Sequence, residues 1–269
     1  MIIDAHVHCS GTERSDDCLR TFDDAGIDVA VLLAPFLSPG YSLDDRESLR
    51  RANRHLGELT AGHRDRLIGF AVVDPRDPEA SALLTEAVER HGARGVKMVP
   101  TGWYPYDAEV QPLFSTAQQL GLPVLFHSGI FIDGRSGRFC RPVHFEALRD
   151  YPDLRVTLAH LGWPWTDEAI AVGLIDLING VPADAAQFRF DLSFGAPPVY
   201  RRESLQRALA VLGGGLLQFG SDCFLPCDAA QLRERRRWVE ELLDELDVST
   251  ADRARIWSGT AAAWLGLEV

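Results

Sequence analysis

The stretch "MIIDAHVHCSG" (Met1–Gly11) ends an apolar run with two histidines, His6 and His8, on either side of one valine. On a β-strand, residues two apart point to the same face, so both imidazoles are expected to aim at one point. Two polar rings buried together need a partner, and a metal ion suits them because neutral imidazole is a common ligand. The alternative is a partly exposed strand end with two hydrogen-bonded histidines.

Seven further apolar or β-branched runs follow, separated by longer helical patterns. The eight runs are Met1–Val7, Val29–Pro35, Leu67–Val73, Gly95–Pro100, Leu122–Ser128, Leu154–His160, Phe188–Phe194 and Leu216–Asp222. The helical patterns include Leu43–Thr60, Pro78–His91, Val110–Leu120, His144–Tyr151, Arg202–Leu212, Ala229–Leu246 and Ala251–Leu265. Continuous apolar runs are typical of parallel strands covered on both faces, and the alternation indicates βαβ crossovers.

Eight such units in 269 residues predict a (β/α)8 TIM barrel, with residues 1–269 as a single domain. A doubly wound open sheet is the alternative fold of the α/β class. It is less favoured because no Gly-x-Gly-x-x-Gly motif follows the first run.

Composition narrows the classes of partner. Lys and Arg number 27 against 39 Asp and Glu, a formal charge of −12, which argues against nucleic acid or an anionic membrane as the main partner. Five cysteines and the absence of a charged-then-apolar leader before Asp4 predict a cytoplasmic protein with reduced thiols. We expect a small-molecule substrate, with a homodimer as the candidate assembly.

Polar residues recur at the carboxyl ends of the predicted strands. His6 and His8 end the first run, Lys97 lies within the fourth, His127 and His160 end the fifth and sixth, and Asp222 ends the eighth. In a TIM barrel these ends share one face, where active sites lie. The same placement on five strands therefore predicts a metal site.

Several motifs together resemble the amidohydrolase superfamily of metal-dependent TIM-barrel enzymes. They are "DAHVH", "RGVKMVP", "GLPVLFHSG", "RPVHFEALRDYPDLRVTLAHLGWPW", "FDLS", "FGSD" and "IWSGTAAAWLGL". Within the superfamily, the chain is similar to the branch of metal-dependent hydrolases that also holds aminocarboxymuconate-semialdehyde decarboxylase. The closing motif departs slightly, because this branch often has Asn where Thr260 stands.

The resemblance implies a ligand set. His6, His8, His127 and Asp222 match the positions that bind the single metal of mononuclear members. His160 matches a histidine that polarises the substrate or, in binuclear members, binds a second metal. The expected cofactor is Zn2+, or another divalent metal such as Mn2+ or Fe2+, as one or two ions.

The ligand types also suggest roles in catalysis. A divalent ion held by imidazoles and a carboxylate makes hydroxide available near neutral pH. Asp222 would accept the proton of this water and pass it to a leaving group, while His160 would donate to the developing oxyanion. Asp4 would either orient a ligand ring or simply form a polar strand end.

Lys97 is unusual because burying an ammonium group is costly. Three interpretations compete. Carboxylated by carbon dioxide, Lys97 would bridge two metals, as in binuclear relatives with a lysine on the fourth strand. Unmodified, it would hold a substrate carboxylate, or its stem would extend to bring the amine to the rim of the barrel.

The expected pocket walls come from three loops. Trp103 in "TGWYPY" and Trp163 in "GWPW" would stack on a flat substrate, or pack the loops over the rim. One of Arg135, Arg138 and Arg141 would bind a substrate carboxylate, although most loop arginines are only solvated. In "FDLS", Asp191 and Ser193 would line the barrel floor or support the ligands.

Three functions fit these residues. The leading one is a metal-dependent hydrolase of a small ester, lactone or amide, and a strand-four lysine is, by resemblance, a mark of hydrolytic relatives. The second is a non-oxidative decarboxylase of an unsaturated or aromatic acid. The third is a catalytically silent metal-binding protein, which Asp222 argues against because a structural site favours a closed ligand set without a poised base.

Overall fold

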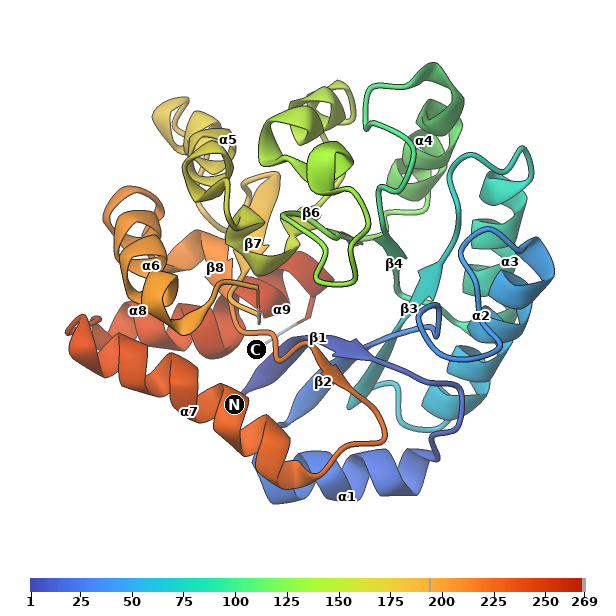
Figure 1. Ribbon diagram of the computed structural model, residues 1–269, viewed down its shortest axis with the longest axis horizontal. Coiled ribbons are helices and arrows are strands. Elements are labelled where there is room, and N and C mark those ends of the chain that lie inside the picture. The colour runs from blue at the N-terminus through green and yellow to red at the C-terminus, as the bar shows by residue number, and fades with distance from the viewer. Residues whose placement is uncertain (194, 268–269) are drawn as a thin grey trace.

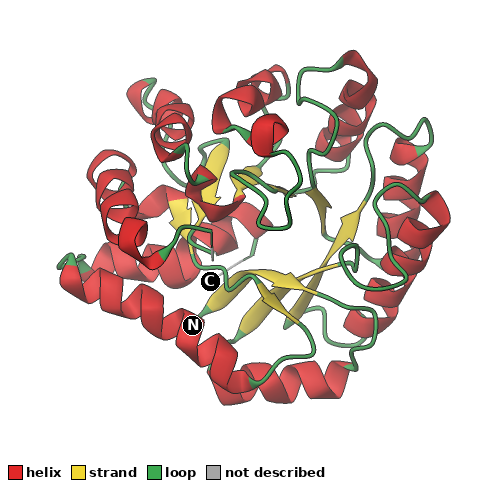
Figure 2. Ribbon diagram, in the orientation of Figure 1, coloured by secondary structure: helices red, strands yellow, loops and turns green. Residues whose placement is uncertain are grey.

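The computed structural model describes residues 1–193 and 195–267, and there the strands form one parallel sheet surrounded by helices (Figure 1, Figure 2). The strands are β1 (Ile3–His8), β2 (Val29–Leu33), β3 (Leu67–Val72), β4 (Gly95–Met98), β5 (Val124–Phe126), β6 (Val156–Leu158), β7 (Phe188–Asp191), β8 (Leu217–Gln218) and β9 (Cys223–Phe224). Neighbours in the chain are neighbours in the sheet from β1 to β8, and β9 adds to the free side of β1. Each of the eight predicted runs therefore contains a strand.

The sheet closes into a barrel through the segment that holds β8 and β9. β8 pairs with β7, and β9 pairs with β1. Between them the Ala5 amide donates to the Phe219 carbonyl at 3.0 Å, and the Asp222 amide donates to the His6 carbonyl at 2.9 Å. The predicted TIM barrel is confirmed. Its eighth strand is broken where Asp222 takes a left-handed backbone conformation (φ 55°).

The helices pack around the outside of the barrel (Figure 2). They are α1 (Ser15–Ala25), α2 (Arg46–Thr60), α3 (Ala80–His91), α4 (Gln111–Gln119), α5 (Thr166–Ile178), α6 (Pro198–Leu212), α7 (Ala229–Glu245), α8 (Thr250–Ala254) and α9 (Thr260–Leu265). Short 3-10 turns cover Ala108–Val110, Gly137–Cys140, Pro142–Asp150, Ala159–Gly162 and Gly214–Leu216. In the described residues, no helix is both long and apolar enough to cross a membrane.

Two sequence expectations differ from these bounds, and a third falls partly outside the described residues. The predicted helix His144–Tyr151 is a 3-10 turn, which ends where Tyr151 precedes a proline that disfavours helical geometry. The predicted helix Ala251–Leu265 is divided between α8 and α9 by a π-helical turn at Arg255–Gly259. Residue 194, the last of the predicted run Phe188–Phe194, lies outside the described residues.

The floor of the barrel is filled by α9. Trp264 is fully buried in the inner cluster with Ile3 and Phe70, and its ring lies 5.1 Å from that of Phe70. Its indole N–H donates to the carbonyl of Arg155, the residue just before β6. These partners lie at the amino ends of strands, so the opposite, carboxyl end is left for the polar residues.

A β-bulge in β1 decides which side chains face that end. The register of β1 against β2 shifts by one residue between Asp4 and Val7. Ile3 and Ala5 belong to the inner cluster, whereas Val7 packs in the outer layer between barrel and helices. Strict alternation would keep residues 3, 5 and 7 on one face. The extra residue reverses the alternation, and bulges of this kind are common beside active sites.

Candidate metal centre

His6, His8 and Asp222 form a compact group at the carboxyl end of the barrel. One ligand atom from each lies within 4.8 Å of the other two. The two Nε2 atoms of His6 and His8 are 3.1 Å apart, and Asp222 Oδ1 lies 3.3 Å from the first and 3.0 Å from the second. The structure thus brings together three of the residues that the sequence analysis proposed as metal ligands.

His127 and His160 lie beside this group, with the His160 ring between those of His6 and His127. The His160 ring lies 5.4 Å from the His6 ring and 5.0 Å from the His127 ring. His127 follows β5, and its amide donates to the Met98 carbonyl at 2.9 Å. Among the described residues, no group hydrogen-bonds to its buried Nε2 atom. A buried ring nitrogen without a protein partner is what a bound metal would satisfy.

Burial favours the neutral form of His6, His8 and His127. Burial, and next the Lys97 charge, lower the pKa of His6 to about 4 and outweigh the opposing effect of Asp191. Burial also lowers the pKa of His8 and His127. Although burial alone would raise the pKa of Asp222, the neighbouring histidines hold it well below its usual range. Neutral imidazoles and an ionised carboxylate are the forms that bind a metal.

Two buried aspartates, Asp191 on β7 and Asp4 on β1, support this group. His6 Nδ1 lies 2.9 Å from Asp191 Oδ2 at the end of β7. Asp4 Oδ1 accepts the amides of His6 at 3.2 Å and Ser221 at 2.9 Å. Asp4 therefore holds the backbone on either side of the centre, and these contacts are to backbone amides rather than to a ligand ring.

Lys97 lies inside the barrel, against His6. Its side chain is about 1% exposed and Nζ is 3.4 Å from His6 Nε2. This burial excludes the interpretation that the amine reaches the rim. Burial lowers the pKa of Lys97 to about 8, against the opposing charges of Asp191 and Asp222.

A cavity of about 110 Å³ opens above these groups. Its polar lining includes His8, Lys97, His127, His160, Asp222 and Arg135, and its apolar lining includes Phe36, Val99, Phe131 and Phe224. Phe224 stacks on the His8 ring at 4.4 Å, and Phe131 stacks on the His127 ring at 4.2 Å. The sequence analysis missed these phenylalanines, because apolar residues in loops give no signal that separates a pocket wall from ordinary packing.

The predicted substrate contacts divide into two groups. Trp163 and Arg135 line the cavity, and Arg135 also pairs with Asp133 at 2.8 Å. The other three predicted residues are placed elsewhere. Trp103 is buried against Phe114 and Phe126, Arg138 lies over the Phe139 ring, and Arg141 pairs with Glu168. These three do not line the cavity, and core packing or local pairing uses their side chains.

The residues present fit a divalent ion. Three buried imidazoles offer Nε2 atoms, one carboxylate supplies negative charge, and the cavity leaves a side open to a small molecule. Mixed nitrogen and carboxylate ligands with an open position are typical of catalytic rather than structural sites. His6, His8 and Asp222 would hold the ion, with His127 as the further ligand.

Comparison with known proteins supports the fold. The family model described as amidohydrolase matches residues 3–267. No curated protein matches the chain. A solved 2,6-dihydroxybenzoate decarboxylase has a TM-score of 0.73 at 18% identity, with 99% of both chains covered. The 5-carboxyvanillate decarboxylase of Novosphingobium aromaticivorans, complexed with manganese, has a TM-score of 0.70 at 18% identity, with 99% of this chain and 96% of that chain covered.

A third similar structure carries the name of a hydrolase. It is a Pseudomonas putida protein named "putative 2-pyrone-4,6-dicarboxylic acid hydrolase", with a TM-score of 0.62 at 22% identity. The match covers 100% of this chain and 98% of that one. At these identities the three structures share a fold with this chain, and the reaction has to be argued from its own site.

Proposed function

The chain belongs to the amidohydrolase family, and on that premise we propose that it is a metal-dependent hydrolase of a small, flat, carboxylated ester, lactone or amide. The observation that carries the proposal is the meeting of His6, His8 and Asp222 under an open cavity, with His127 beside them. We propose Zn2+ as the ion, with Mn2+ or Fe2+ as alternatives, since ligands of this kind accept all three.

The bound ion would acidify a water molecule and polarise a substrate oxygen. The protein's own groups handle the protons. Asp222 is ionised and faces the cavity, so its carboxylate can take a proton from the attacking water and return it to the leaving group. Its closeness to His6 and His8 keeps it at the point where the water would lie.

The cavity suggests the class of substrate. Phe131 and Phe224 offer ring faces or edges to a flat molecule, and Phe36 adds a third apolar wall. Lys97 at the base offers a cation for a carboxylate, and Arg135 offers a second one nearer the mouth. A volume of about 110 Å³ favours a small molecule rather than a polymer.

Decarboxylation of an unsaturated or aromatic acid is the second candidate. Two of the structures reported above are decarboxylases of aromatic acids, and the same aromatic walls and cations would hold such acids. In that reaction Asp222 would exchange a proton with a ring carbon, and no oxygen of water would enter the product.

One labelling experiment separates the two reactions. Zinc-loaded enzyme would be screened against lactones, carboxylated esters and amides, and aromatic acids, and any converted compound would be repeated in oxygen-18 water. Hydrolysis should place one labelled atom per turnover in the product carboxylate. Release of carbon dioxide, with no oxygen label and with deuterium entering at carbon in heavy water, would assign the decarboxylase function instead. A His6→Ala/His8→Ala variant, treated in parallel, controls for contaminating enzymes.

A further inference from the structure

Asp191 contacts two histidines at the centre, His6 on β1 and His160 in the turn after β6. Its side chain is fully buried at the end of β7. Oδ2 accepts from His6 Nδ1 at 2.9 Å. Oδ1 accepts the backbone amides of His160 at 2.8 Å and Ser193 at 3.0 Å, and also the hydroxyl of Ser193.

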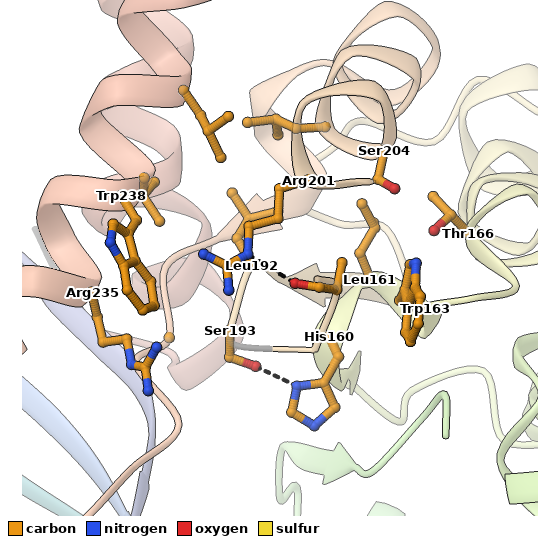
Figure 3. Close-up of a pocket in the computed structure, with 15 residues that line it drawn as sticks. His160, Leu161, Trp163, Thr166, Leu192, Ser193, Arg201, Ser204, Arg235 and Trp238 are labelled. Atoms are coloured by element: carbon orange, nitrogen blue, oxygen red, sulfur yellow. Dashed lines mark hydrogen bonds between the residues drawn. The ribbon is translucent and has the colours of Figure 1, made fainter. Parts of the chain in front are cut away.

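Ser193 carries the connection on to the His160 ring. Its Oγ lies 2.8 Å from His160 Nδ1, as the dashed line in Figure 3 shows. A carboxylate can only accept, so the single hydroxyl proton of Ser193 points to Asp191. The Ser193 oxygen must then accept from the ring, which places a proton on Nδ1 of His160.

The same reasoning applies to His6. Its Nδ1 faces Asp191 Oδ2, so the proton of the neutral ring is on Nδ1 and the lone pair is on Nε2. Nε2 is the atom that faces His8 and Asp222. In His160 the second ring nitrogen lies on the edge away from Ser193 (Figure 3). The His160 ring also lines the cavity above the candidate metal centre.

We propose that Asp191 is a positioning residue that keeps the Nδ1 atoms of His6 and His160 protonated together, which leaves Nε2 as the His160 nitrogen that can accept a proton on the substrate side. The inference rests on the proposed metal centre and refines the earlier expectation that His160 donates to an oxyanion. That donation would require His160 to be protonated first. In the neutral state it can accept a proton from the attacking water or bind a second ion.

Backbone geometry supports a dedicated role for Asp191. His160 has φ 61°, in the left-handed region that residues with large side chains rarely adopt. The Asp191 carboxylate accepts the His160 amide in this conformation. Gly195 lies against the other side of His160, and a Cβ there would come within 2.4 Å of His160 Cβ. The His160 residue is therefore confined at its amide by Asp191 and at its Cβ by Gly195.

The test reads tautomers directly, by long-range 1H–15N NMR of the full-length protein labelled with 15N-histidine and loaded with zinc. His6→Gln and His160→Gln variants assign the two signals. In wild type both rings should carry the proton on Nδ1. Zinc affinity, measured by competition with a chelator, gives a second readout that does not depend on turnover.

Two substitutions should separate the effect of Asp191 on His6 from its effect, through Ser193, on His160. In Asp191→Asn the amide nitrogen is expected to face His6, because Oδ1 already accepts three donors. His6 should then lose the Nδ1–H form and zinc affinity should fall roughly 10–100-fold, the usual effect of removing a group that orients a ligand. Ser193→Ala should free the His160 tautomer and leave His6 unchanged, and Ser193→Thr, which keeps the hydroxyl, should restore His160.

An Nε2–H form of His160 in wild type would overturn the proposal. So would an unchanged His160 tautomer in Ser193→Ala, or an unchanged His6 tautomer and zinc affinity in Asp191→Asn. If Asp191→Asn fails to fold, the two Ser193 variants still decide the effect on His160. None of these readouts needs a substrate, so a negative result here is distinct from a failure of the hydrolase proposal.

Discussion

Asp222 is the residue on which the proposed chemistry depends most directly. Its left-handed backbone (φ 55°) is a conformation that asparagine also tolerates, so Asp222→Asn should retain the fold. The variant loses the group that accepts the proton, and turnover should fall on the order of a hundredfold or more. Steady-state kinetics with the identified substrate, together with zinc content and circular dichroism, test this. Turnover within threefold of wild type would place the base elsewhere.

Lys97 is expected to be an unmodified amine. Its Nζ lies 3.4 Å from His6 Nε2, within direct contact, and a carbamate group would have to be inserted at this distance. Intact mass should therefore show no added carbon dioxide, and metal alone should restore activity to stripped enzyme. A requirement for bicarbonate, or two ions per chain, would support the carboxylated form.

If Lys97 holds a substrate carboxylate, Lys97→Met should act mainly on binding. We expect KM to rise about tenfold or more, since a hydrogen bond to a charged group contributes about 1.5–3 kcal/mol. For an analogue of the substrate without the carboxylate, the increase in KM should be much smaller. Equal losses for both compounds would contradict a carboxylate contact.

At the scale of elements, the turn between β8 and β9 must approach β1 closely to place Asp222. Gly220 makes this possible, because a Cβ at this position would lie 2.9 Å from His6 Cβ and 3.4 Å from Ser193 Cβ. Gly220→Ala should therefore shift His6 and lower zinc affinity by about tenfold, a typical effect of disturbing a ligand's support. Gly259→Ala is the control, because its Cβ would meet the flexible Arg255 side chain at 3.3 Å and the Ala254 carbonyl at an ordinary contact distance of 3.7 Å. Equal affinities for the two variants would contradict this account.

The loop between β1 and α1 is ordered by one buried carboxylate. Glu13 accepts the amides of Ser10 and Gly11 and lies 3.0 Å from His55 Nε2 on α2. Burial alone would raise the pKa of Glu13, but hydrogen bonds, above all that of His55, lower it to about 2. A lowered carboxylate pKa stabilises the native state above the unfolded value, and this stability is lost as pH falls toward the native value.

Glu13→Gln should consequently be less stable than wild type at pH 7, by about 1–3 kcal/mol. The difference should shrink as pH falls from about 5 toward 2, because the wild-type carboxylate becomes protonated in the unfolded state first. Urea unfolding at several pH values measures it. A difference that stays constant with pH would show that charge is not the cause.

The sequence could predict the strands and the ends of strands, but not every side-chain direction. The eight runs are recognisable because parallel strands are apolar throughout. The spacing of His6 and His8 predicted that they share a face of the strand, and they do. The bulge that turns this face toward the barrel interior could not be predicted from the sequence. The Asp191 contacts join residues 31 and 185 positions apart, and such contacts follow only from barrel closure.

For the whole molecule, the metal should act as part of the folded state. An ion that binds only the native chain stabilises it, by about 2.7 kcal/mol at a free concentration one hundred times Kd. In a chain of this size that corresponds to a Tm increase of roughly 5–10 °C. Calorimetry with zinc and after chelation measures the shift. His6→Ala/His8→Ala should abolish it, while the control His63→Ala, which removes a histidine outside the centre, should not.

Closure of the barrel by β9 against β1 also sets an order of events during synthesis. His6 leaves the ribosome 215 residues before Ser221, an interval of roughly 10–40 s at cellular elongation rates. Through that time β1 is an open strand edge and its imidazoles lack their carboxylate partner. Only a nearly complete chain can bring Asp222 to them, so the nascent protein should capture its ion late. Metal uptake would then report that the barrel has closed.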